Sequence, residues 1–361
     1  MGQPSIDITF IQKAVTAIVR SERGVACVVV LDDSKATAGY ATYKYAADVP
    51  SDGFTADNLA AIRRCWLCNV NKVIVVWVPT DAEFADVQAI LENLSYNYVC
   101  ICDDSMQQDL ASYIVTKNGN SPGKKYIAVV TGVTTADSKF VINVKNATVH
   151  DIDTDNTLDM VMYLPRLTSV LANLPMNRSI TYYELEDIDD VDLSFVDIEH
   201  TIDEAVDAGN LVLWIDEDKV KVGRGVNTLT TLTASDTADM KKIIIVESMN
   251  IILEDIYSTF KDYYIGKYKN SYNNQCLFIS AVNSYFRQLA REEILDPEYD
   301  NHSYVDVEAQ REAWLAIGKT EAQDWTEAEV KKMTFKSFIY LAGQVKILDA
   351  IEDLKFVITM E

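Results

Sequence analysis

Short apolar runs alternate with helical patterns through the first half of the chain, and this alternation limits the fold more than any other feature. The run Val25–Leu31 is continuous and apolar, as in a buried strand. Further strands are expected at 41–45, 72–78, 98–102, 126–130 and 140–144, with helices at 55–67, 81–94 and 105–117. This order of elements predicts an α/β unit.

A second region follows an acidic stretch. After a helix expected at 157–172, residues 184–192 mark a change of composition and a domain border. The later elements are expected to be helices at 198–207, 237–263, 277–294 and 305–317, strands at 211–215, 219–222, 336–348 and 354–360, and a short helix capped by Thr326 with Glu329 three positions later. Two domains fit a chain of 361 residues, at roughly 150 residues per domain.

Both ends of the chain carry the alternation of a half-buried strand. The apolar residues that share one face are Ile6, Ile8 and Phe10 near the start and Leu354, Phe356, Ile358 and Met360 at the end. Terminal segments are usually frayed and polar unless something holds them, so both are expected to pair with a sheet. That sheet belongs either to the same chain or to a neighbouring subunit.

The charge is large, negative and uneven. The net charge is −23, and residues 151–218 contain 18 acidic residues against Arg166 and Arg178, a net of −16. Residues 261–291 instead carry a net of +4. Phosphates would be repelled by most of this surface, which argues against nucleic acid as a partner. The asymmetry is compatible with subunits that meet acidic face to basic face.

Composition places the chain among ordinary globular proteins. Hydrophobic residues make up 48% and charged residues 24% of it. The apolar runs are far shorter than the roughly 20 residues of a membrane span, so no membrane insertion is expected. The first residues lack the basic and apolar regions of a secretory signal, so we expect a cytosolic protein whose six cysteines are reduced thiols.

Two patterns suggest metal ligands, and both have a simpler interpretation. Cys65 and Cys68 with Cys100 and Cys102 are the candidates for a four-thiolate zinc site, but the first pair lies in a helical pattern and the second on one face of a strand. Core thiols are therefore favoured. The run 151–155 resembles the start of a calcium loop without its glycine and glutamate, which favours a solvated acidic turn.

Motifs for nucleotide binding or nucleophilic catalysis are incomplete. Residues 119–125 are one residue short of a phosphate-binding loop, and 223–228 lack the third glycine of a dinucleotide fingerprint. His150, His200 and His302 stand alone, with no acid or nucleophile paired to them by local spacing. We therefore expect no catalytic residues, no cofactor and no metal, which favours a structural or interaction role.

Three groups of residues remain: 4–8, 16–17, 20–21 and 23–24 near the start; Arg224-Gly225-Val226-Asn227-Thr228-Leu229-Thr230, 262–267 and 270–272 in the second half; and 345–353 near the end. Together they resemble contractile tail sheath proteins of myovirus-type phages and phage-tail-like bacteriocins. The similarity is greatest to the shorter sheaths of Gram-positive prophages. Residues 30–200 match in length and order only.

The resemblance implies a two-domain sheath fold, mixed α/β (α+β), whose terminal strand arms are exchanged between subunits. The expected divisions are an N-terminal arm and linker at 1–23, an α/β outer domain at 24–197, a C-terminal sheath domain at 198–344 and a C-terminal arm at 345–361. The arm strands would present the seven alternating apolar residues named above. Flexible turns beside the arms would lie at Gly24, Asp349 and Asp353.

The resemblance also implies a function without catalysis. The subunits would stack as hexameric rings around an inner tail tube and contract to drive the tube through a target envelope. The partners would be the protein itself, the tube protein, and baseplate and tail terminator proteins. The location would be the host cytoplasm during assembly and then a virion tail or a released tail-like particle.

Two surfaces follow as hypotheses. A helix that touches the tube would do so through Arg287, Gln288 and Arg291, although a solvated helix face explains the same spacing. Lys261, Lys267 and Lys269 would meet the acidic segment 184–218 of a neighbouring subunit. Two rival interpretations stay open: an α/β enzyme with an unrecognised carboxylate or thiol site, and a non-contractile shell or scaffold subunit.

Overall fold

The computed structural model describes residues 17–197 and 200–360. The chain divides into two compact units, one made of 21–254 with 349–361 and the other of 255–348 with the N-terminal residues up to Arg20. The division falls inside helix α6 (Ile243–Tyr263). In the part of the chain that is described, no helix is long and apolar enough to cross a membrane.

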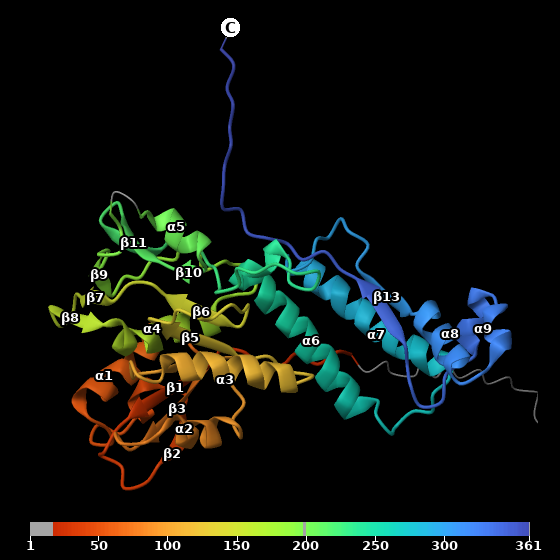
Figure 1. Cartoon of the computed structure of the whole chain (residues 1–361), viewed down its shortest axis with the longest axis horizontal. Coiled ribbons are helices and arrows are strands. Elements are labelled where there is room, and N and C mark those ends of the chain that lie inside the picture. Colours follow the sequence, from red (N-terminus) through yellow and green to blue (C-terminus); the bar gives the residue numbers. More distant parts are fainter. Residues whose placement is uncertain (1–16, 198–199, 361) are drawn as a thin grey trace, which may run out of the picture. The chain divides into compact units, whose positions relative to one another are not determined.

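The larger unit is built on a mainly parallel sheet (Figure 1, red to green). Among the described residues its seven strands lie in the order β10-β6-β5-β4-β1-β3-β2. Neighbouring strands are parallel, except that β2 at one edge is antiparallel to β3. The strands are β1 (Val25–Leu31), β2 (Gly39–Tyr43), β3 (Lys72–Val78), β4 (Tyr98–Ile101), β5 (Ile127–Thr131), β6 (Val141–Val144) and β10 (Asn210–Leu211).

Helices cover both faces of this sheet. They are α1 (Ala56–Arg64), α2 (Phe84–Leu91), α3 (Gln107–Asn120) and α4 (Met160–Asn173). Successive residues of a strand point to opposite faces, so Val28 of β1 belongs to the buried cluster that contains Ile62 of α1 and Leu164 of α4, whereas Val29 belongs to the cluster that contains Leu110 of α3. Burial on both faces explains why the strands read as continuous apolar runs. The predicted α/β unit is confirmed.

Smaller elements complete this unit. Strands β7 (Thr148–Asp151), β8 (Asn156–Asp159) and β9 (Ile188–Val191) form an antiparallel sheet in the order β8-β7-β9, and β11 (Leu213–Asp216) pairs with β12 (Lys219–Val222). Glu217 and Asp218 form the tight turn of that hairpin with φ of 50° and 64°. The remaining helical elements are α5 (Ile202–Asp207) and the short turns η1 (Ala46–Asp48), η2 (Cys65–Leu67) and η3 (Ala238–Lys241).

The smaller unit is mostly helical. Its elements are the end of α6, α7 (Tyr272–Arg291), α8 (Val307–Ala316), η4 (Thr320–Gln323), α9 (Glu327–Lys332), and the antiparallel strands β13 (His302–Val305) and β14 (Leu341–Gln344). α7 buries one face, and the hydroxyl of its Tyr285 donates to the fully buried Asp255 of α6 at 2.6 Å. The predicted capping box of Thr326 and Glu329 is present at the start of α9.

Several predicted boundaries differ from the structure. The strand expected at 336–348 is reduced to β14: Lys336 lies in a turn with φ of 45°, and only Leu341–Gln344 pair as a strand. Residues 354–360, also expected as a strand, pair with no strand among the described residues. The helix expected from 237 begins as the turn η3 and becomes α6 only at Ile243. The strand expected at the N-terminus, with Ile6, Ile8 and Phe10, lies outside the described residues.

The compact units follow packing, whereas the expected divisions follow the composition change and the family resemblance. β10 lies beside β6 at the edge of the large sheet, so residues after 200 pack with those before 197. The divisions expected at 1–23, 24–197, 198–344 and 345–361 stay a prediction about the sequence domains.

Candidate assembly interface

The C-terminal segment leaves the protein as an exposed chain. Within the smaller unit, the side chain of Lys346 pairs with Asp296 at 2.7 Å, and the amide of Leu348 donates to the carbonyl of Ile294 at 3.0 Å. From residue 354 onward this anchoring ends. The alternating apolar side chains are then exposed by 89%, 74%, 70% and 89% at Leu354, Phe356, Ile358 and Met360.

A cluster of charges holds the segment just before this exposed part. We call it the C-terminal root cluster: Arg224, Lys242, Asp349, Glu352 and Asp353. The ammonium of Lys242 lies 2.6 Å from Asp349 Oδ2 and 2.9 Å from Glu352 Oε2, and Arg224 lies 2.7 Å from Asp353 Oδ1. The Glu352 side chain is only 4% exposed. Two of the expected flexible positions, Asp349 and Asp353, are therefore ion-paired in this structure.

The environment of the two cations stabilises their charged forms. Burial alone would lower the pKa of Lys242, but hydrogen bonds to Asp349 and Glu352 outweigh it and the pKa is raised. A hydrogen bond to Asp353 likewise raises the pKa of Arg224. The Thr181 hydroxyl donates to Glu352 Oε1 at 2.6 Å, so the buried carboxylate also has a neutral partner.

A backbone pairing places these cations beside each other. Residue 226 bridges to 242 in antiparallel fashion, and the amide of Ile243, the first residue of α6, donates to the carbonyl of Gly225 at 3.0 Å. A Cβ at Gly225 would lie 2.5 Å from Ile180 Cγ2, so only glycine fits. The run that contains Arg224 is therefore fixed against the start of α6.

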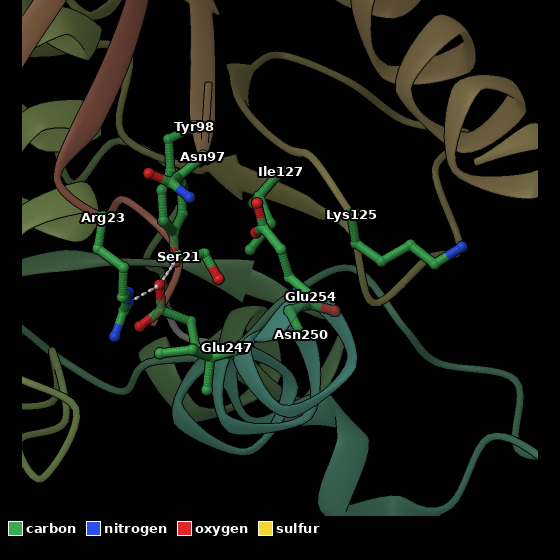
Figure 2. A pocket seen from close by; sticks show the side chains of 10 residues that line it. Ser21, Arg23, Asn97, Tyr98, Lys125, Ile127, Glu247, Asn250 and Glu254 are labelled. Atoms are coloured by element: carbon green, nitrogen blue, oxygen red, sulfur yellow. Dashed lines mark hydrogen bonds and ion pairs between the residues drawn. The ribbon is translucent and has the colours of Figure 1, made fainter. Parts of the chain in front are cut away.

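The N-terminal linker is held by a second cluster, the N-terminal root cluster: Glu22, Arg23, Lys72, Tyr98 and Glu247. Figure 2 shows the guanidinium of Arg23 and the hydroxyl of Tyr98 converging on Glu247 of α6, at 3.0 Å and 2.6 Å. Glu22, which directly precedes Arg23, pairs with Lys72 at 2.6 Å. The Tyr98 side chain is buried, so its hydroxyl depends on Glu247 for a partner.

The expected flexible residue Gly24 follows this cluster directly. Its φ is 73°, and an added Cβ would lie 2.9 Å from Asn71 Cβ. Its carbonyl accepts a hydrogen bond from the Lys72 amide at 3.2 Å. Gly24 thus provides a tight, packed turn into β1 in this structure.

Val19 and Arg20, just before Ser21, are anchored in the smaller unit. The amide of Val19 donates to the Thr259 hydroxyl at 2.9 Å. Arg20 lies 3.1 Å from Glu292 and 3.6 Å from the buried carboxylate of Asp255. These contacts fix the chain before it reaches the N-terminal root cluster.

The residues expected to contact a tube or a neighbouring subunit lie on the surface. Arg287, Gln288 and Arg291 are exposed on α7, on the side opposite its buried residues. Lys261, Lys267 and Lys269 are also exposed, and Lys267 lies 5.4 Å from the ring centre of Tyr263.

Part of the acidic segment is already neutralised within the protein. Asp187 pairs with Arg166 at 3.1 Å, Glu184 with Lys219 at 2.7 Å and Asp216 with Lys221 at 2.6 Å.

The cysteines expected as core thiols are placed in or beside the core. Cys65 and Cys100 are fully buried, and burial raises the pKa of the Cys65 thiol to about 12. The Cys65 thiol donates to the carbonyl of Pro165, and that of Cys68 to the carbonyl of Cys65. Over the described residues, no group of histidine, cysteine or acidic side chains is arranged to hold a metal ion.

No pairing of a histidine with an acid was expected from local spacing, but each of the three histidines lies close to a carboxylate. His200 lies 3.0 Å from Asp197, three residues earlier, and His302 lies 3.1 Å from Asp300. His150 lies 2.6 Å from Asp189 of β9. Local spacing could have indicated the first two pairs, whereas the third depends on strand pairing.

Acidic residues at the carboxyl ends of the parallel strands hold their own loops. This edge is where doubly wound sheets usually bind ligands. Asp32 Oδ2 accepts hydrogen bonds from the Thr55 amide and the Asn58 side chain, both at 2.8 Å, and Asp103 Oδ1 accepts one from the Ser105 amide at 2.9 Å. Asp151, from the suspected calcium loop, pairs with Arg64 at 2.6 Å. These carboxylates have structural partners.

The described structure combines a doubly wound α/β unit, a mostly helical unit and an exposed terminus with the alternation of a strand. The family model of the phage tail sheath C-terminal domain matches residues 235–361. The chain is 28% identical to the tail sheath protein of Clostridium phage phiCD119 over 372 residues, 99% of each chain. The chain is thus similar to structural tail sheath proteins, in agreement with the resemblance noted in its sequence, and those relatives are not enzymes.

Solved structures share the fold at low sequence identity. A sheath tail protein from Desulfitobacterium hafniense is 16% identical, with a TM-score of 0.67 over 84% of this chain and 94% of that one. The helical sheath of the anti-feeding prophage in its contracted state is 12% identical, with a TM-score of 0.69 over 100% of both chains. The contracted sheath of the extracellular contractile injection system PVC is 12% identical, with a TM-score of 0.68 over 100% of this chain and 98% of that one.

Proposed function

We propose that this chain is the subunit of a contractile sheath, which polymerises as stacked hexameric rings around an inner tube and contracts to drive the tube through a target envelope. The observation that carries the proposal is the exposed apolar alternation of 354–360. Burial of such side chains stabilises a contact by about 1.5–3 kcal/mol for each one fully buried. A second copy of the chain would provide that burial by strand addition.

Strand β14 is the best candidate to accept the arm. On β13, the amide of Ser303 donates to Asn283 of α7 at 2.7 Å, so this edge of the two-stranded sheet is already occupied. Ser303 lies opposite Gly343, and because the Ser303 amide bonds to Asn283, these two residues form a pair without hydrogen bonds between the strands. Such pairs alternate with hydrogen-bonded pairs along an antiparallel ladder, so the backbone N–H and C=O groups of Gly343 and of Leu341 point away from β13. An edge of this kind is a template for another strand.

The proposed partners follow from the sheath relatives. The anti-feeding prophage protein was solved in a helical sheath and in a baseplate. We extend this to self-association of the present chain and to a baseplate contact, and we add an inner tube protein and a tail terminator. The location would be the host cytoplasm during assembly and then a virion tail or a released particle.

The surface residues have roles within this proposal. The exposed face with Arg287, Gln288 and Arg291 would meet the tube. Lys261, Lys267 and Lys269 would meet acidic residues of a neighbouring subunit that are not neutralised within their own chain. Arms at 1–23 and 345–361, turning at Gly24, Asp349 and Asp353, would keep the subunits linked during contraction.

Electron microscopy of the purified full chain beside a chain that ends at Asp353 tests the proposal. This truncation removes the exposed arm but keeps the C-terminal root cluster. We expect tubes of stacked rings from the full chain and none from the truncated one.

Matched variants separate arm pairing from general damage. Phe356→Ser and Ile358→Ser together should prevent tubes, whereas Lys355→Ser and Thr359→Ser, on the other side of the arm, should permit them. Compact particles of fixed size from the full chain, or normal tubes from the truncated chain, would contradict the proposal.

A further inference from the structure

The two root clusters converge on the beginning of the same helix. Lys242 immediately precedes α6 and binds the C-terminal root, while Glu247, within α6, binds the N-terminal root. Five residues of helix rise correspond to about 7.5 Å along the axis. Both contacts lie in the larger unit, which also contains Arg23 and the residues after 349.

We propose that Lys242 and Glu247 are positioning residues that couple the directions in which the two terminal arms leave the subunit. The inference rests on the proposed donation of the arms and adds a specific junction to it. At the N-terminal root, the cation Arg23 of the linker pairs with the anion Glu247 of α6. At the C-terminal root, anions of the linker pair with the cation Lys242, which directly precedes α6. The contacts therefore have opposite polarity at the two roots.

The immediate surroundings make this junction stiff. Asn227 donates from its side chain to the carbonyl of Met240 at 2.8 Å and from its amide to the carbonyl of Lys241 at 2.9 Å. Gly225 accepts from Ile243, and its amide donates to the Thr181 hydroxyl, which in turn donates to Glu352. A displacement of the C-terminal root thus acts on the first turn of α6.

The junction is also accessible to solvent on one side. A cavity of about 260 Å³ is lined by Trp214, Arg224, Glu352 and Asp353 together with neighbouring residues. The exposed pair of Arg224 with Asp353 is weakened by salt, whereas the pair of Lys242 with the buried Glu352 is screened much less. We therefore expect the Lys242 contact to contribute most to holding the C-terminal root.

Site-specific proteolysis of the full chain, kept below the concentration at which light scattering detects polymer, measures the opening of each root. A glutamate-specific protease reports on the bond after Glu352 and an arginine-specific protease on the bond after Arg23. Each product is identified by its mass, because Lys242→Glu and Lys241→Glu also create a new glutamate site. For Lys242→Glu we expect about tenfold faster cleavage after Glu352 and about threefold faster cleavage after Arg23. Glu247→Gln should accelerate both sites as well.

Controls distinguish coupling from local damage. Lys241→Glu changes the neighbouring lysine, which makes no ion pair among the described residues, and should leave both rates unchanged. Asp349→Asn perturbs the C-terminal root from the arm side without altering α6, so it serves if Lys242→Glu does not fold. It too should accelerate cleavage after Arg23.

The outcomes are separable from those of the proposed function. If each variant accelerates cleavage only at its own root, the coupling is refuted even when full-length chains form tubes. If the chain that ends at Asp353 still forms normal tubes, arm donation fails, whatever the proteolysis shows. With both correct, Lys242→Glu tubes should have irregular ring spacing, and wild-type spacing would overturn the positioning role.

Discussion

Removing the carboxylate of Asp32 should destabilise the α/β unit by an amount that depends on pH. Asp32 follows β1, its side chain is 1% exposed, and it accepts hydrogen bonds from Ser34, Thr55 and Asn58. Burial opposes ionisation, but these donors outweigh it and lower its pKa from 3.8 to about 2. The difference corresponds to about 2 kcal/mol of unfolding free energy.

The sign of the effect follows from the lowered pKa. The stabilisation is fully present above the unfolded pKa near 4 and is lost as the pH falls through the folded value of about 2. Asp32→Asn should therefore cost about 2 kcal/mol at pH 7 and progressively less between pH 4 and pH 2.

The unfolding free energy of the larger unit can be measured by urea denaturation followed by hydrogen exchange. Peptides that span β1 to α1 report on this unit alone. The exposed Asp52 provides a control through Asp52→Asn, which should change stability by less than about 0.5 kcal/mol. A constant difference between Asp32→Asn and the wild type from pH 7 to pH 2 would refute the assignment of the stabilisation to the ionised carboxylate.

Three further changes test other parts of the structure. Gly225→Ala should lower thermal stability by about 1–3 kcal/mol, because its Cβ overlaps Ile180, whereas Gly119→Ala, with nothing within 4 Å, should be neutral or stabilising. Tyr285→Phe leaves a buried carboxylate of α6 with one donor fewer and should cost about 1–3 kcal/mol in urea denaturation. Reversing Lys267 and Lys269 to Glu should impair assembly seen by electron microscopy, and an unchanged sheath would contradict the proposed charge contact.

The elements that sequence predicted best are those whose burial is encoded in periodic residues. Val25–Leu31 and Lys72–Val78 were predicted to the residue because both faces of the sheet are covered, which requires uninterrupted apolar side chains. The sheet of β7, β8 and β9 was missed, since its strands have four residues each and include polar residues such as His150 and Asp190. Short strands of this kind depend on long-range pairing and leave little local signal.

The root clusters show a different limit of sequence reasoning. Nothing local distinguishes Glu352 from its acidic neighbours, yet it is the carboxylate that becomes buried between Lys242 and Thr181. Its partners lie more than a hundred residues away, and a single sequence does not encode such a pairing in any period. Asp349 and Asp353 were expected as hinge positions, and their ion pairs with Lys242 and Arg224 could not be read from the sequence.

The run from Arg224 to Asn227 illustrates what structure adds to a recognised motif. As a dinucleotide fingerprint it was incomplete, and as a sheath motif it had no stated physical role. In the structure its residues make defined contacts. Arg224 binds the arm root, Gly225 permits close packing and accepts from the first amide of α6, and Asn227 binds the preceding turn. Because these contacts connect the arm to a helix start, substitutions here should disturb assembly before they unfold the α/β unit.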